Sequence, residues 1–192
     1  DPVLSRGLGD VYKRQGYGSR YVPMNRSNDE LVIDQGPLIA TGRKLDIYLT
    51  GSTLLGVQAP NGQVAFTRRG DLTVDQSGFI STANGHVVLG EGGAPITAPV
   101  GVELAITDDG TVTATDPVQP DAPPTIVGNL LLRDATGVRM VRRVDGLYET
   151  ITARGKGGDF EGGPNVPVVQ PGSLEGSSVS YTHLTLPTTH CV

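Results

Sequence analysis

The 192-residue chain is poor in aromatic residues and in cysteine. It contains no Trp and only three Phe, and its one cysteine is Cys191. A single cysteine excludes an internal disulfide and a zinc site made of several cysteines. Long hydrophobic runs are also missing, since no segment approaches the roughly 20 apolar residues that a membrane-spanning helix needs. We also find no basic segment followed by an apolar stretch and a small-residue cleavage site, so we expect no cleaved signal peptide.

Positive charge is scarce as well. Lys and Arg number 15 against 20 Asp and Glu, which gives a formal net charge of -5. Without a basic stripe, nucleic acid is not expected as a partner. Glycine and proline are abundant instead, at 27 and 14 residues. Both are poor helix formers, and no amphipathic helical spacing extends over three turns. The composition therefore predicts a mainly β fold of short strands and hairpins, flanked by extended segments.

Turn-forming residues separate short apolar segments in the middle of the chain. Asn61-Gly62 predicts a hairpin with a two-residue type I′ turn, in which both central residues take positive φ. We predict further turns at residues 76–78, 84–85 and 108–110, and an interruption at the proline-rich residues 116–124. The segments expected as strands include 45–51, 55–57, 64–66, 86–89, 104–106, 126–134, 138–146 and 147–152.

The two ends of the chain read differently from its middle. Residues 1–15 and 180–192 lack strand or helix periodicity and resemble translated sequencing-adapter sequence, so we expect both to be non-native. This interpretation sets aside His183, His190 and Cys191, whose spacing matches no common zinc motif. The remaining chain divides into an extended linker at 16–44, a β-rich domain at 45–153, and a Gly-rich loop with a return segment at 154–179.

Residues with catalytic potential are few. His86 begins a strand, where a structural role is expected. The glycine-rich residues 90–93 lack the Lys-Ser/Thr of a phosphate-binding loop and precede Pro95, so they predict a tight turn or bulge. Arg142-Arg143 beside Asp145 predicts a solvated strand face with a cross-strand ion pair. We therefore expect no catalytic residue, metal site or cofactor, and no enzyme activity.

Several motifs occur in an order that resembles the flagellar axial proteins, the rod and hook group of the bacterial basal body. Two positions depart from the family pattern: Ala94 is an insertion in the motif G-E-G-G-x-P-I, and Ser178 stands where the family usually has Asn. The resemblance covers about residues 30–179 and is greatest to the proximal rod members. The motifs are T-R-x-G at 67–70, D-x-x-G at 75–78, G-E-G-G-x-P-I at 90–96, D-G-T-V at 109–112, D-G-L-Y at 145–148 and L-E-G-S-S-V at 174–179.

The resemblance implies a structural role without an active site. Subunits of this family stack helically, with terminal helices as an inner tube and the β domain, here 45–153, as an outer layer. It implies a subunit of the rod that spans the periplasm, exported by the flagellar type III apparatus without a cleaved signal peptide. The implied partners are proximal and distal rod subunits and further copies of the chain, with no nucleic acid or small-molecule substrate. By this resemblance, we expect the family's two terminal helices to lie beyond the adapter-like ends of this sequence. The residues matched to family motifs and assembly are Thr67, Arg68, Gly70, Gly90, Glu91, Gly92, Gly93, Pro95, Asp145, Gly146, Leu147, Leu174, Glu175, Ser177 and Val179.

Two other classes of protein remain open. A β-domain adhesin or carbohydrate-binding module also suits the pattern of strands and turns, although sugar stacking needs exposed aromatic rings. A β-fold glycosidase would need two carboxylates facing each other at roughly 5–10 Å, which distant residues could supply.

Overall fold

The computed structural model describes residues 35–119, 121–152 and 155–176. Within these ranges the chain forms strands and no helix, which confirms the predicted mainly β fold. The strands are β1 (Leu38–Ala40), β2 (Ile47–Leu49), β3 (Thr53–Gln58), β4 (Val64–Thr67), β5 (Leu72–Val74), β6 (Ile80–Thr82), β7 (Glu103–Ile106), β8 (Thr111–Thr115), β9 (Thr125–Asn129), β10 (Leu132–Asp134), β11 (Met140–Arg142), β12 (Tyr148–Thr152), β13 (Gly155–Lys156), β14 (Val169–Pro171) and β15 (Ser173–Glu175).

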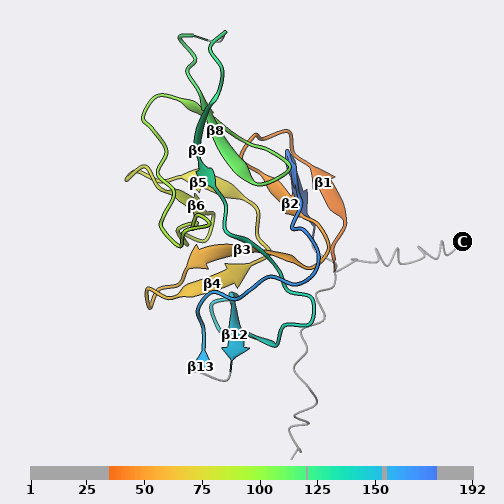
Figure 1. Ribbon diagram of the computed structural model, residues 1–192. Helices are drawn as coiled ribbons and strands as arrows, with labels where there is room; N and C mark the ends of the chain where they lie inside the picture. The colour runs from red at the N-terminus through yellow and green to blue at the C-terminus, as the bar shows by residue number, and fades with distance from the viewer. Residues whose placement is uncertain (1–34, 120, 153–154, 177–192) are drawn as a thin grey trace, which may run out of the picture.

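A six-stranded antiparallel sheet occupies the middle of the molecule. Its strands follow the order β10-β3-β4-β12-β11, and β13 pairs with β12. Figure 1 shows β3 and β4 side by side at the centre, with β12 and β13 on one side and the β8–β9 arm projecting on the other. Smaller sheets surround the central one: β5-β6, β7-β8-β9, and two sheets, β14-β2 and β1-β15, that pair early strands with late ones.

Strand β3 separates two apolar cores. Successive side chains of a strand point to opposite faces, so a strand covered on both faces must be apolar at consecutive positions. Leu54 packs into the smaller core, whereas Leu55 and Val57 pack into the larger one. Phe66 in the smaller core meets Phe160 edge to face, with ring centroids 4.8 Å apart. The two cores therefore share one strand.

One turn geometry recurs along the described chain. In each five-residue segment, the N–H of the first residue donates to the carbonyl of the fifth residue. The N–H of the fourth residue donates to the carbonyl of the first residue. The fourth residue is always a glycine with positive φ. This is the three-residue hairpin loop in which a type I turn is followed by a left-handed residue. The segments are 59–63, 75–79, 82–86, 90–94, 107–111 and 143–147.

The hairpin predicted around Asn61-Gly62 is present, but its predicted type I′ turn is wrong. Gly62 has a φ of +77°, and no described non-glycine residue has positive φ, so Asn61 does not adopt the required conformation. The reason is the residue before it. Pro60 has its φ fixed near −65°, which suits the first central position of a type I turn. Gly62 alone then supplies the left-handed residue.

The segment 126–134 does not form the single strand that was expected. It divides into β9 and β10, which belong to different sheets. Between them, Leu130 is buried in the larger core and Leu131 in the smaller one. The N–H of Leu130 donates to the carbonyl of Gly110, and the N–H of Leu131 donates to the carbonyl of Leu89. Two adjacent leucines thus let the chain cross from one core to the other, a change that an apolar run does not reveal.

Strands β1 and β15 form a two-stranded ribbon, here defined as residues 36–41 and 172–176. Their register aligns Leu38 with Glu175 and Ala40 with Ser173. The rest of the described chain is called the body. β1 is the first described strand and β15 the last, so the chain enters and leaves the body at one place (Figure 1). Strand pairing thereby extends beyond residues 45–153. Residues 31–33 of the linker, which by their sequence could form at most a short strand, lie outside the described residues.

Candidate functional site

Arg68 lies where the ribbon meets the body. It directly follows β4, and its guanidinium reaches the backbone at the end of β2 and in the turn that follows. Nη2 donates to the carbonyl of Leu49 at 2.8 Å, and Nη1 donates to that of Gly51 at 2.6 Å. A longer bond of 3.4 Å joins Nη1 to Thr53 O. All of these bonds join the guanidinium to the body, and none involves the ribbon.

Glu175 of β15 completes this arrangement. Its Oε2 accepts from Arg68 Nε at 2.7 Å, and its Oε1 accepts from the N–H of Gly36 at 2.7 Å. The Arg68 and Glu175 side chains are only 10% and 15% exposed. Hydrogen bonds between ionised groups are shorter and stronger than neutral ones, and partial burial protects them from screening by salt. The contact joins two motifs that lie 107 residues apart in the sequence.

Two glycines permit close backbone contact near this pair. A Cβ on Gly70 would lie 1.8 Å from the carbonyl oxygen of Ile47, whose own N–H donates to Gly70 O at 3.0 Å. A Cβ on Gly36 would lie 2.0 Å from the carbonyl oxygen of Gly176. Contacts this short exclude any side chain. The glycine of T-R-x-G is therefore needed where the chain after β4 passes against β2.

The structure brings three of the predicted motifs together. Thr67, through its Oγ1, accepts from the N–H of Arg69 at 3.1 Å, which shapes the chain just after β4. A hollow of about 190 Å³ is lined by this segment and by the turn at 145–147. A second hollow of about 470 Å³ is lined by residues 68–71 and 174–176. One region of the fold therefore contains Thr67, Arg68, Gly70, Asp145, Gly146, Leu147, Leu174 and Glu175.

The turn after β11 is held by ion pairs. Arg143 bonds to Asp145 at 3.0 Å within the turn and to Glu149 of β12 at 3.2 Å. The predicted ion pair is present, but Arg143 lies in the turn after β11 and not on a solvated strand face. Burial alone would raise the pKa of Asp145, but the bonds from Arg143 and from the N–H of Leu147 outweigh it and lower that pKa below its usual value. The carboxylate is therefore a fixed part of the turn.

The G-E-G-G-x-P motif lies apart from this region. Residues 90–94 form one of the recurring turns, as predicted, and Ala94 is its fifth residue, whose carbonyl accepts from the N–H of Gly90 at 2.8 Å. Glu91 bonds through its N–H to Asn129 O at 3.0 Å, and Pro95 pairs with Leu89. The motif therefore shapes the connection from β6 to β7 and ties it to the end of β9. Gly90, Glu91, Gly92, Gly93 and Pro95 have no contact with the Arg68–Glu175 pair among the described interactions.

Ser177 and Val179 lie outside the described residues. The same holds for Ser178 and for the set-aside residues His183, His190 and Cys191.

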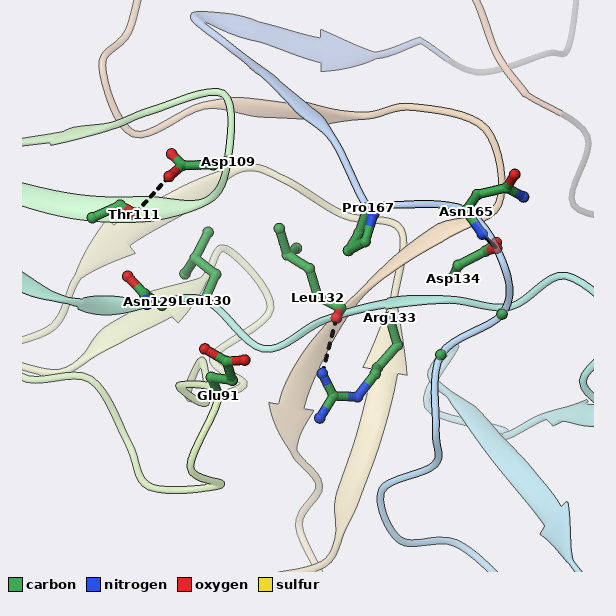
Figure 2. A pocket seen from close by; sticks show the side chains of 12 residues that line it. Glu91, Asp109, Thr111, Asn129, Leu130, Leu132, Arg133, Asp134, Asn165 and Pro167 are labelled. Atoms are coloured by element: carbon green, nitrogen blue, oxygen red, sulfur yellow. Dashed lines mark hydrogen bonds between the residues drawn. The ribbon is translucent and has the colours of Figure 1, made fainter.

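A polar hollow of about 310 Å³ was not anticipated from the sequence (Figure 2). Asp134 at its edge is 3% exposed and accepts bonds from the N–H and hydroxyl of Thr136 and from the N–H of Asn165. Burial would raise the pKa of Asp134, but these bonds outweigh it and lower the pKa. The D-x-T spacing signals the local turn, whereas the contact with Asn165 comes only from the tertiary fold.

Two of the carboxylates around this hollow, those of Asp134 and Asp109, are bound within their own turns. Asp109, at another edge, accepts from the hydroxyls of Thr107 and Thr111, and these bonds lower its pKa. Arg133 pairs with Asp159 at 2.9 Å. Within the described ranges, no three His, Cys, Asp or Glu side chains are grouped so as to hold a metal ion. The same ranges contain no helix that could span a membrane. The arrangement around the hollow thus braces loops against one another.

Comparison with known proteins places this geometry in a family. Residues 48–114 match the family described as "Flagellar hook protein FlgE/F/G D1 domain". The chain is 40% identical over 147 residues to the flagellar basal-body rod protein FlgF of Salmonella typhimurium, covering 75% of this chain and 57% of that protein. It is 38% identical over 149 residues to FlgF of Escherichia coli, covering 76% and 57%.

A second kind of rod protein is also similar. The flagellar basal-body rod protein FlgG of Buchnera aphidicola subsp. Schizaphis graminum is 29% identical over 182 residues, covering 94% of this chain and 64% of FlgG. The chain thus spans somewhat more than half the length of the FlgF relatives that it matches, at 57%. With the D1 match and these identities, the chain belongs to the family of flagellar basal-body rod proteins.

Proposed function

We propose that the protein is a structural subunit of the bacterial flagellar basal-body rod. It would contribute to the helical drive shaft through contacts between subunits, in the part of the basal body that spans the periplasm. Its relatives are named as basal-body rod proteins, which supports this function over an adhesin or a carbohydrate-binding module. The role is mechanical, so the protein is not an enzyme and acts on no small-molecule substrate.

One observation carries this proposal beyond similarity: the T-R-x-G and L-E-G motifs meet at the ribbon. Arg68 and Glu175 join there, beside strands that are antiparallel neighbours. A domain whose two chain connections lie side by side can sit on one side of an assembly while its flanking segments run together. This supports an outer rod domain built on residues 45–153. Parts of the 16–44 linker and of the 154–179 return segment add strands β1, β13, β14 and β15 to it.

The partners follow from the same reasoning. The chain would contact proximal and distal rod subunits and further copies of itself. Contacts between different surfaces of identical subunits produce an open helix when their rotation does not close a ring. We assign the surface around the two hollows beside Arg68 to assembly. Export would occur through the flagellar type III apparatus without a cleaved signal peptide.

A chimera tests this function. Residues 36–176 would replace the aligned segment of Escherichia coli FlgF, and the chimera would be expressed in a strain that lacks FlgF. We expect the chimera in purified basal bodies and restored swimming in soft agar.

Two controls make the result interpretable. Native FlgF serves as the positive control, and a chimera carrying an unrelated β domain of similar size should not restore swimming. If the test chimera is exported and folded yet absent from basal bodies, the rod function is wrong. Strong binding of the chain to a glycan array would instead support the adhesin.

A further inference from the structure

The ribbon is attached to the body without a share in either apolar core. No residue of 36–41 or 172–176 belongs to the larger or the smaller core cluster. All three residues of β1 are exposed, including Leu38 at 43% and Ile39 at 52%. Burial of apolar surface is the main stabilising contribution in a fold. The ribbon therefore depends on polar contacts to a degree that the central sheet does not.

Those polar contacts are few, and they differ in length and in charge. Gly172 donates its N–H to Asp46 O at 2.7 Å, and the Tyr48 hydroxyl donates to Gly36 O at a longer 3.3 Å. Thr41 donates its hydroxyl to the buried carboxylate of Asp46 at 2.7 Å. Between ionised side chains, the contact from ribbon to body is that of Arg68 with Glu175. It lies at the end of the ribbon farthest from Gly172.

The two side chains of this ion pair have different further hydrogen-bond partners. The body binds Arg68 through the carbonyls of Leu49 and Gly51, two hydrogen bonds in which the ribbon takes no part. Glu175 uses one oxygen for Arg68 and the other for the N–H of Gly36 on the opposite strand. One carboxylate therefore closes the end of the ribbon and fastens it to the body at once.

We propose that Arg68 and Glu175 form a latch, and that releasing it lets the ribbon open while both apolar cores stay folded. Proteins open locally in cooperative units, and a unit with little buried apolar surface opens most easily. The consequence for assembly rests on the proposed function: in a rod subunit the latch sets the direction in which the chain enters and leaves the outer domain. Arg68 and Glu175 are then positioning residues, with no part in any chemistry.

Amide hydrogen exchange of the whole chain tests the latch. Glu175→Gln keeps an oxygen for Gly36 but removes the charge facing Arg68. Losing a hydrogen bond between charged groups should speed amide exchange in β1 and β15 by about 10- to 100-fold, with β3 and β4 unchanged. Arg68→Ala should give the same local pattern. Arg69→Ala is the matched control, because Arg69 pairs with Asp71 on the surface and leaves Glu175 untouched.

Two results would overturn the latch. One is unchanged exchange in β1 and β15 of Glu175→Gln. The other is faster exchange in all strands together, which would make the pair a general support of the fold. If Arg68→Ala fails to fold, Glu175→Gln still decides, because its shape is preserved. The measurement needs no rod: a chimera absent from basal bodies would remove the proposed function and leave the latch standing.

Discussion

At the scale of single residues, buried polar side chains fix the loops of this protein. Asp134 is the clearest example, since one carboxylate holds its own turn through Thr136 and a distant loop through Asn165. Gly163 makes room for it, because a Cβ there would lie 2.6 Å from an Asp134 oxygen. A buried carboxylate is stable only when hydrogen bonds replace its hydration, and here they do. Asp134 therefore acts as a brace between β10 and the 162–165 loop.

The lowered pKa of Asp134 predicts a pH-dependent stability. Its folded-state pKa lies below the unfolded value of roughly 3.9, so the ionised form stabilises the fold above about pH 4. That contribution is lost as pH falls through the lower folded-state pKa. Asp134→Asn should therefore reduce the free energy of unfolding by about 1–3 kcal/mol at pH 7. Urea unfolding of both proteins from pH 7 to pH 3 should show this difference shrinking in acid.

Asp121→Asn is the control for this series, because Asp121 is exposed in the loop between β8 and β9. It should leave the free energy of unfolding nearly unchanged. A difference between wild type and Asp134→Asn that stays constant down to pH 3 would contradict the role given to the Asp134 charge.

At the scale of elements, one turn design organises the hairpins. Its requirement is a single glycine in the left-handed region at the fourth position, as at Gly62 and Gly110. Because the two residues before that glycine keep negative φ, they can vary: Pro60-Asn61 in one hairpin and Asp108-Asp109 in another. The glycine at the fourth position of each of these six segments is thus explained by the turn rather than by a ligand.

The turn at residues 59–63 can be tested directly. Gly62→Ala should lower the free energy of unfolding by about 1–2 kcal/mol, because the left-handed conformation is strained for alanine. Apart from the neighbouring residues in the chain, no atom lies within 4 Å of the added Cβ, so no steric clash with the rest of the fold adds to the strain. Asn61→Ala should have a smaller effect, since Asn61 has negative φ and loses only exposed hydrogen bonds to Gln63. If Asn61→Ala proves the more destabilising of the two in urea unfolding, the type I assignment is wrong.

At the scale of the whole molecule, β3 couples the two cores. Leu54 and Leu55 are both fully buried, at 0% exposure, on opposite faces of the same strand. Neither core can be lost without exposing one face of β3. We therefore expect the body to unfold in one cooperative transition, while the ribbon opens separately.

Leu54→Ala and Leu55→Ala test this coupling. Each should lower the free energy of unfolding by about 2–5 kcal/mol, the usual range for truncating a buried leucine. Both variants should still show a single thermal transition by calorimetry and circular dichroism. Val144→Ala is the control, because Val144 is fully exposed and should change stability by less than about 0.5 kcal/mol. Two separate transitions in either leucine variant would show that the cores are independent.

Much of the local structure could be predicted because its causes are local. The fold class followed from abundant Gly and Pro, and the turns near residues 76–78, 84–85 and 108–110 followed from short-range signals. The type I′ turn predicted at Asn61-Gly62 is wrong because the fixed φ of Pro60 suits the first central position of a type I turn. The division of 126–134 was missed because two adjacent leucines that enter different cores look like one apolar run.

The motifs around Arg68 and Glu175 could be recognised in the sequence, but their meeting could not. By itself the sequence determined which residues could turn, which could be buried and which family the chain resembles, because these depend on side-chain chemistry and on neighbours along the chain. Only the tertiary structure decided that Glu175 reaches Arg68, that Gly70 must lack a Cβ and that Asp134 holds Asn165. Each of these contacts joins segments whose approach is set by packing of the whole fold, and no local pattern carries that information.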